Sequence, residues 1–226
     1  MIELVVFDMA GTTVDEDNVV YKTVRDAINA AGYEFSLEQV LTHGAGKEKS
    51  QAIRDVLCLD QQAHSEAEVE SIFTDFKNRL GQAYRQLDVK GMPGAADLFG
   101  ELRQRNIQVV LNTGYDRSTA EGLVEKIGWQ IGVDIDGLVT ASDVETGRPG
   151  PDMILRAMEL TGIESAEQVA KIGDSQIDIH EGNNAKCGLT VGITTGAHTS
   201  EQLAAANPSA VIDSLAEFTE LLPSNH

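Results

Sequence analysis

The fold of this chain is decided near its N-terminus by the stretch Asp8-Met9-Ala10-Gly11-Thr12-Thr13-Val14-Asp15. The apolar run before it, residues 2–7, has the length and composition of a short buried strand, so Asp8 stands at the carboxyl end of that strand. Gly11 and the two threonines then turn the chain. A carboxylate at such a turn, with backbone N–H groups around it, suits an attack on phosphorus.

The second half of the chain alternates between apolar strand patterns and helical patterns. We expect strands over residues 107–112, 138–139, 169–172, 189–193 and 210–212, and helices over residues 95–105, 117–127, 151–161 and 177–185. Strands that alternate with helices imply right-handed crossovers and a parallel sheet. The fold class is therefore α/β. The final residues 223–226 are expected to be frayed.

The segment between the first strand and this alternating region has a different character. Apolar residues at helical spacing predict helices over residues 19–31, around residues 53–57, and over residues 65–86, and no strand pattern is convincing. A chain of 226 residues can hold one sizeable core with a small accessory domain. We therefore expect residues 1–14 and 89–226 to form the core, and residues 15–88 to form an inserted all-helical domain.

The net charge of -19 limits the partners of the protein. Nucleic acids and anionic membranes require a basic face, so neither is expected as a partner. The two cysteines provide no disulfide framework. The sequence also shows no 18-residue apolar run and no cationic signal segment. Together these observations favour a location in the cytoplasm. A small anionic substrate would need a metal ion and a few placed cationic side chains to attract it.

Polar side chains follow several of the expected strands, at the edge of a parallel sheet where ligands bind. Besides Asp8, these are Thr113, Arg148, Asp174 and Asp178. A threonine before a glycine can hold a phosphoryl oxygen, an arginine can neutralise charge, and two aspartates four residues apart suit Mg²⁺, which prefers oxygen ligands. Each group alone is more simply interpreted as a helix cap, a turn or a surface side chain.

Taken together in this order, the four motifs resemble those of the haloacid dehalogenase superfamily of aspartyl-phosphate enzymes. The resemblance implies a Rossmann-like core with a helical cap, and Asp8 as the nucleophile. It implies roles for Thr113 and Arg148 in catalysis, and Mg²⁺ held by Asp8, Asp174, Asp178 and the backbone of Ala10. It also implies a substrate bound near Gly11, Thr12, Gly46 and Gly114. Phosphatases of the superfamily usually have a second aspartate where this chain has Ala10, whereas Asp-x-Ala-Gly-Thr-Thr-x-Asp is similar to the phosphonoacetaldehyde hydrolases (phosphonatases).

A lysine of the inserted domain extends this resemblance. Phosphonatases break a carbon–phosphorus bond through an imine between a cap lysine and the substrate aldehyde, and this lysine follows a glycine by three residues. Here Gly46 and Lys49 match, as does the pair Ile53-Arg54. Lys47 is expected roughly 200° away around the same helix, facing elsewhere. From the residues alone, both lysines could equally be solvated charges at a helix end.

Two positions depart from the family pattern. Ala52 stands where the family often has a histidine, although His43 could lie nearby, and Met9 stands where an aromatic residue is common. The principal hypothesis is a Mg²⁺-dependent phosphonatase-like hydrolase of a small phosphonate or phosphate. The alternatives are a phosphomonoesterase similar to phosphoglycolate phosphatases, and a non-catalytic binding module. The resemblance also allows a homodimer formed through the cap.

Overall fold

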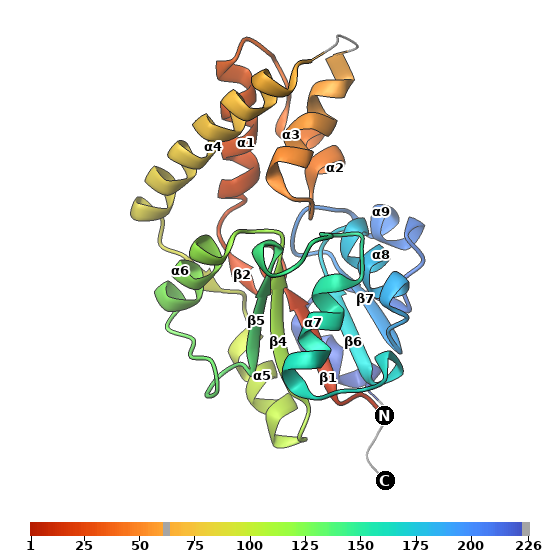
Figure 1. Ribbon diagram of the computed structural model, residues 1–226. Helices are drawn as coiled ribbons and strands as arrows, with labels where there is room; N and C mark the ends of the chain where they lie inside the picture. Colours follow the sequence, from red (N-terminus) through yellow and green to blue (C-terminus); the bar gives the residue numbers. More distant parts are fainter. Residues whose placement is uncertain (61–63, 223–226) are drawn as a thin grey trace.

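A six-stranded parallel sheet forms the centre of the molecule in the computed structural model, which describes residues 1–60 and 64–222 (Figure 1). The expected frayed end at residues 223–226 lies outside the described residues. The strands are β1 (Leu4–Asp8), β4 (Gln108–Thr113), β5 (Gly137–Thr140), β6 (Val169–Gly173), β7 (Leu189–Ile193) and β8 (Ala210–Ile212). The α/β fold class is confirmed.

The order of the strands in the sheet determines where the candidate site lies. The order is β5-β4-β1-β6-β7-β8, with every neighbouring pair parallel. This is the Rossmann order, in which the chain winds outward in one direction from β1 and then in the other. The winding reverses between β1 and β6, where the crevice beyond the strand ends binds ligands in open α/β sheets. Asp8 ends β1 and Asp174 follows β6, so both lie at this reversal.

Helices cover both faces of the sheet because the strands are apolar on both sides. Leu4 and Val6 of β1 belong to a core cluster with α7 (Asp152–Thr161), whereas Val5 and Phe7 belong to the cluster that contains α5 (Ala95–Gln104). The remaining helices of the core are α6 (Arg117–Ile127), α8 (Gln176–Ala185) and α9 (Ser200–Ala205). The short helix α9 was not expected from the sequence.

Four helices lie beyond the carboxyl ends of the strands, over the edge where Asp8 is found (Figure 1). They are α1 (Val19–Ala30), α2 (Leu37–Gly44), α3 (Lys49–Leu57) and α4 (Glu66–Gln86). The sequence predicted three of them and missed α2. The described residues of 16–88 contain no strand, but Asp15 belongs to β2 (Val14–Asp15), which pairs antiparallel with β3 (Lys90–Gly91). The expectation that residues 15–88 lack strands was therefore wrong at its first residue.

Within residues 1–60 and 64–222, no helix is both long enough and apolar enough to cross a bilayer.

Candidate active site

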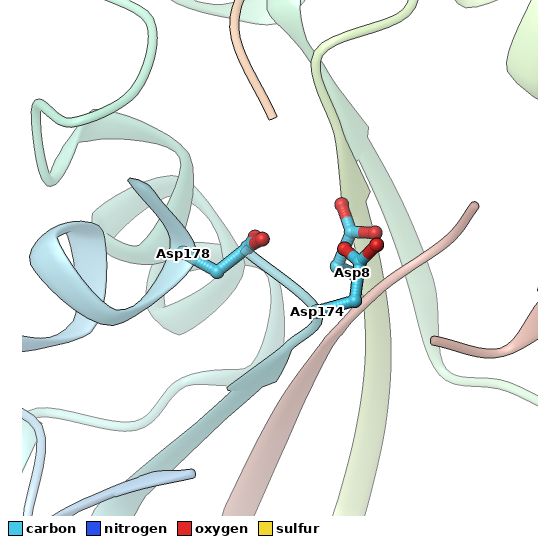
Figure 2. A group of neighbouring side chains, drawn as sticks. All are labelled: Asp8, Asp174 and Asp178. Carbon is cyan, nitrogen blue, oxygen red and sulfur yellow. The ribbon is translucent and has the colours of Figure 1, made fainter. Parts of the chain in front are cut away.

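Three buried carboxylates converge at the carboxyl end of the sheet (Figure 2). Asp8 ends β1, Asp174 follows β6, and Asp178 lies in the first turn of α8. One oxygen of each lies within 4.8 Å of the others. The structure thus brings Asp8 together with Asp174 and Asp178, the other two predicted metal-binding side chains, which are far from it in the sequence.

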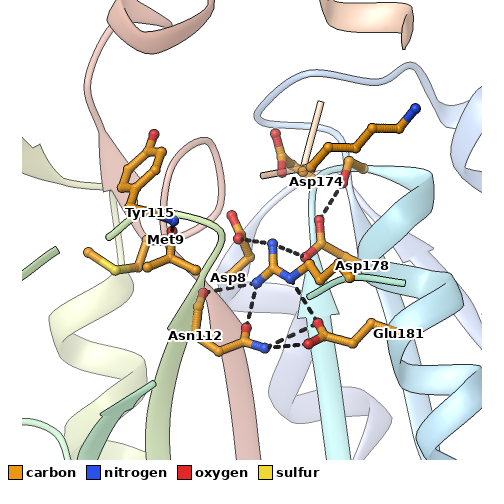
Figure 3. A network of polar contacts seen from close by, with 12 residues as sticks. Asp8, Met9, Asn112, Tyr115, Asp174, Asp178 and Glu181 are labelled. Carbon is orange, nitrogen blue, oxygen red and sulfur yellow. Dashed lines mark hydrogen bonds and ion pairs between the residues drawn. The ribbon is translucent and has the colours of Figure 1, made fainter. Parts of the chain in front are cut away.

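Arg148 joins Asp8 and Asp178 to Asn112 of the sheet. Figure 3 shows Asp8, Asn112, Asp178 and Glu181 in this network of polar contacts. Its Nη1 atom lies 2.6 Å from Asp8 Oδ1 and 2.9 Å from Asp178 Oδ1. Its Nη2 atom donates to the backbone and side-chain oxygens of Asn112, at 3.0 and 2.7 Å. Because each of its three nitrogens donates a hydrogen bond, the planar guanidinium is held rigidly. The predicted arginine therefore contacts the candidate nucleophile directly.

Three members of the same network were not predicted from the sequence: Asn112, Lys171 and Glu181. The Nζ atom of Lys171 donates to Asn112 Oδ1 at 2.8 Å and lies 3.4 Å from Glu181 Oε2. Glu181 also accepts from Asn112 Nδ2 and from Nε of Arg148, at 2.9 and 3.0 Å. A lysine in the middle of the apolar strand β6 was a usable signal, because lysine is almost never fully buried without a partner.

The network holds more negative than positive charge. The members are four carboxylates and two cations: Asp8, Asp174, Asp178, Glu181, Arg148 and Lys171. Burial, and then repulsion from Asp178, raises the pKa of Asp8 to about 6, and burial with repulsion from Asp8 raises the pKa of Asp174 well above its usual value. Arg148 and Lys171 hold the pKa of Asp178 low despite its burial. An excess of two negative charges among hard oxygen donors fits a divalent cation between Asp8 and Asp174.

Replacing Lys171 by methionine should destabilise the fold by about 3–5 kcal/mol, because two buried carboxylates lose a cation while the apolar stem keeps its volume. Urea denaturation monitored by circular dichroism measures the change. The matched control is Lys22→Met in the exposed pair Lys22–Asp17, where the expected loss is below about 1 kcal/mol. Equal losses in the two variants would contradict a structural role for the buried network.

The turn after Asp8 is tightly packed, which explains its glycine. Gly11 has φ +82°, and a Cβ there would lie 2.4 Å from Asp174 Oδ2. Thr13 donates to the carbonyl oxygen of Asp8 at 2.8 Å. The hydroxyl of Thr12 is buried and has no hydrogen-bond partner among the described residues, so it is free to meet a ligand. At Ala10 the side chain is a methyl group that can donate no proton.

The predicted phosphate-binding motif lies where the helical segment touches the sheet. Thr113 ends β4, and its hydroxyl accepts from the N–H of Tyr115 at 3.2 Å, so its own proton remains available. A Cβ on Gly114 would lie 3.3 Å from the carbonyl oxygens of both Gly46 and Lys47. Gly114 therefore lets the two segments approach each other closely. A Cβ on Gly46 would instead lie 2.0 Å from Ile177 Cγ2, so this glycine allows close packing against the start of α8.

Lys49 lies buried at this contact, with only 5% of its surface exposed. It is the first residue of α3, and its Nζ atom donates to the carbonyl oxygen of Lys47 at 2.7 Å. The ring centroids of Tyr21 and Tyr115 lie 5.1 and 5.4 Å from Nζ. Burial lowers the pKa of Lys49 to about 8, against the opposing effect of Asp8. A lysine of this kind supplies a free amine near neutral pH.

Lys47 is not on the helix, because α3 begins at Lys49 with Glu48 as its N-cap. The expected angle around a shared helix was therefore wrong, although the conclusion that the two lysines face different surroundings holds. Lys47 forms an ion pair with Asp55 and its side chain is 29% exposed. The position of the family histidine is filled by Ala52, which packs against Gly44.

The sequence matches the model of the haloacid dehalogenase-like hydrolases over residues 2–186. The chain belongs to this family of hydrolases. It is 32% identical to the phosphonoacetaldehyde hydrolase of Nitratidesulfovibrio vulgaris, over 85% of this chain and 71% of that protein. It is 31% identical to the enzyme of the same name from Bacillus cereus, over 86% of this chain and 76% of that protein.

Solved structures confirm the fold of this hydrolase. A hydrolase from Pseudomonas syringae superposes with a TM-score of 0.85 at 20% identity, over 97% of both chains. A phosphonoacetaldehyde hydrolase-like protein from Oleispira antarctica gives 0.82 at 24% identity, over 97% of this chain and 91% of the other. A predicted phosphoglycolate phosphatase from Haemophilus somnus gives 0.79 at 18% identity, over 97% of both chains. Neighbours with different activities share this fold, so the substrate has to be inferred from the site.

Proposed function

We propose that the protein is a Mg²⁺-dependent hydrolase that cleaves the carbon–phosphorus bond of phosphonoacetaldehyde or a related carbonyl phosphonate. The proposal rests on two residues, Ala10 and Lys49. Ala10 removes the acid that would protonate an oxygen leaving group, and Lys49 provides a buried amine with a pKa of about 8. A carbon leaving group needs no proton on oxygen, but it needs a group that accepts its electrons, and a protonated imine does so.

Four side chains take part in the proposed reaction, those of Lys49, Asp8, Arg148 and Thr113. The amine of Lys49 condenses with the aldehyde and releases water, which leaves a protonated imine. A carboxylate oxygen of Asp8 then attacks phosphorus, and the electrons of the carbon–phosphorus bond move into the imine, which becomes an enamine. Protonation of the enamine at carbon and hydrolysis return acetaldehyde and Lys49, and water cleaves the aspartyl phosphate. Arg148 and Thr113 hold the phosphoryl oxygens and thereby stabilise the developing charge.

Mg²⁺ would be held by the carboxylates of Asp8 and Asp174, with the backbone of Ala10 as a further oxygen ligand and Asp178 in support. Such an ion, when bound, supplies positive charge to the phosphoryl oxygens. The excess negative charge of the carboxylate group supports this part of the proposal. Because Arg148, Lys171 and Ser175 engage Asp178, its role is to position the other groups.

Mg²⁺ should raise the melting temperature of the protein, and EDTA should reverse the rise and abolish turnover. A ligand that binds only the folded state at 100 times its Kd stabilises that state by about 2.7 kcal/mol. Differential scanning fluorimetry with and without Mg²⁺ measures the effect. In Asp174→Asn, which loses one ligand charge, the rise should be largely lost. Full turnover by a verified metal-free sample would refute the metal assignment.

A phosphomonoesterase is the second candidate, favoured by the fold it shares with the phosphoglycolate phosphatase neighbour. Ala10→Asp tests it by restoring the missing acid, whereas Ala10→Asn has the same size without the acid and serves as the control. We expect Ala10→Asp to raise turnover of an ordinary phosphate ester, by up to the 10²–10⁴-fold that a general acid typically contributes. Phosphonate turnover should not rise, and a clear gain there would count against the imine mechanism.

The function itself is tested by a substrate screen with the Mg²⁺-loaded protein. Phosphonoacetaldehyde, phosphonopyruvate and a set of phosphate esters are compared by release of inorganic phosphate. The proposal expects the highest kcat/KM with a carbonyl phosphonate. A phosphate ester that exceeds every phosphonate in kcat/KM would favour the second candidate instead.

The helices α1–α4 form the cap domain of this proposal, with residues 15–88 as its extent. Both connections to the core pass through the short pair β2–β3, and Gly46 meets Gly114 at the contact. This arrangement supports a cap that closes over Asp8 and brings Lys49 to the substrate while excluding water.

A further inference from the structure

Glu16 is a buried carboxylate that the mechanism above does not use. It lies in the first connection between the core and the cap, just after β2, and only 3% of its surface is exposed. The hydroxyl of Tyr84, on α4 of the cap, donates to Oε2, and the hydroxyl of Tyr115, in the core, donates to Oε1 at 3.0 Å. Glu16 thus contacts both the cap and the core from the segment that connects them.

Glu16 and Lys49 are both buried without an opposite charge in direct contact. Among the ion pairs of the described residues, neither takes part. Between them lies Tyr115, whose hydroxyl contacts Glu16 and whose ring centroid is 5.4 Å from Lys49 Nζ. Burying either group as an isolated charge costs free energy. The two groups carry opposite charges, and Tyr115 contacts both of them.

The other groups that face Lys49 are less well placed to take its proton, although Asp8 raises the pKa of Lys49 more than Glu16 does. Asp8 and Arg148 of the core pair with each other, so their effects on Lys49 oppose. Glu48, on the N-terminal side of the same helix, caps α3 through Gln51 and is only half-buried, so solvent screens it. Tyr21 of α1 is neutral, since burial raises its pKa well above the usual value.

We propose that Glu16 is a positioning residue that serves as the counter-charge of Lys49 and takes up the proton that Lys49 must lose, a role that rests on the imine function proposed above. The ammonium of Lys49 gives its proton to the carboxylate of Glu16, whose Oε1 atom is held by the hydroxyl of Tyr115. The proton then returns to the hydroxyl of the carbinolamine, which leaves as water. The nitrogen keeps one positive charge in the protonated imine, opposite the restored carboxylate.

The electrostatics of Glu16 agree with this exchange. Burial raises the pKa of Glu16 to about 7, although the two tyrosines and Lys49 oppose the rise. The pKa of Lys49, lowered by burial, is about 8. Proton transfer between groups of such similar pKa has a small free-energy cost.

The test measures the charge state of Lys49 without relying on C–P cleavage. Formaldehyde and cyanoborohydride methylate free amines, and peptide mass mapping follows Lys49 as a function of pH, with Lys47 in the same peptide as internal reference. In Glu16→Gln, which keeps the side-chain size, the labelling midpoint of Lys49 should move to lower pH by about one unit, because a neighbouring negative charge has been removed. In Glu16→Asp, which keeps the charge, the midpoint should stay near that of the wild type.

Tyr84→Phe provides a second variant in case Glu16→Gln does not fold. It keeps the carboxylate but removes one donor that holds it ionised, so the midpoint should move in the same direction by a smaller amount. In Glu16→Gln, kcat for phosphonoacetaldehyde should also fall about 10²-fold with little change in KM. An unchanged Lys49 midpoint in folded Glu16→Gln, or no reaction of Lys49 at any pH, overturns the proposal. A shifted midpoint in a protein that cleaves no phosphonate supports the pairing and rejects only the proposed function.

Discussion

Asp8→Asn should abolish turnover of every phosphonate and phosphate ester, with a loss of at least about 10⁴-fold, as expected when a covalent nucleophile is removed. The amide keeps the size of the side chain and an oxygen for Arg148, but it cannot form an aspartyl phosphate. Phosphate release with saturating Mg²⁺ measures the loss. Mass spectrometry of acid-quenched samples should detect a phosphoryl group on Asp8 in the wild type and none in the variant.

The matched control is Asp213→Asn. Asp213 also follows a strand of the same sheet, β8, but it is exposed and bonds to Thr194 at the sheet edge. Its replacement should leave kcat within a factor of about two, the scatter of a neutral surface change. Retained turnover in Asp8→Asn would show that phosphorus is attacked by another group, and the reaction proposed for this site would be wrong.

Much of the core could be predicted because its strands are apolar on both faces and alternate with helices. The helix expected over residues 117–127 matches α6, and all five strands expected after residue 91 are present. Parallel topology also implied that residues following different strands would meet, which is why Asp8 and Asp174 were predicted at one site although they are far apart in sequence.

The elements that were missed are short. The helices α2 and α9 have eight and six residues, too few for a helical period to stand out. Both begin with a capping box, Ser36 with Gln39 and Thr199 with Gln202, and this local signal could have located them. The pair β2–β3 has two residues in each strand, so no alternation could reveal it.

The charge network was harder to predict than the motifs. Nothing in the sequence shows that Lys171 and Glu181 belong to the same buried network as Arg148, because their meeting depends on the packing of α8 against β6. The burial of Lys49 between two tyrosines from different segments depends likewise on how the helical segment sits on the core. Side-chain environment, and hence pKa, is a tertiary property that residue spacing alone does not determine.

Lys49→Arg should abolish C–P cleavage, by at least about 10³-fold, while it leaves the positive charge in place. Arginine stays protonated and forms no imine, so the leaving carbon has no group to accept its electrons. In the wild type, a pKa of about 8 leaves about a quarter of Lys49 as free amine at pH 7.5, against roughly one part in a thousand for an ordinary lysine. Borohydride with phosphonoacetaldehyde should therefore trap a covalent adduct on Lys49, found by peptide mass mapping.

Lys47→Arg is the matched control, because it changes a lysine two residues away that is paired with Asp55 and partly exposed. Its effect on kcat should stay within about a few-fold, since an exposed ion pair contributes little. The adduct should remain on Lys49 in this variant. Normal C–P cleavage by Lys49→Arg would end the imine mechanism for this protein. Neither adduct nor cleavage in the wild type would mean that the same carboxylates and Arg148 act on a different phosphorylated substrate, with Lys49 binding it as a cation.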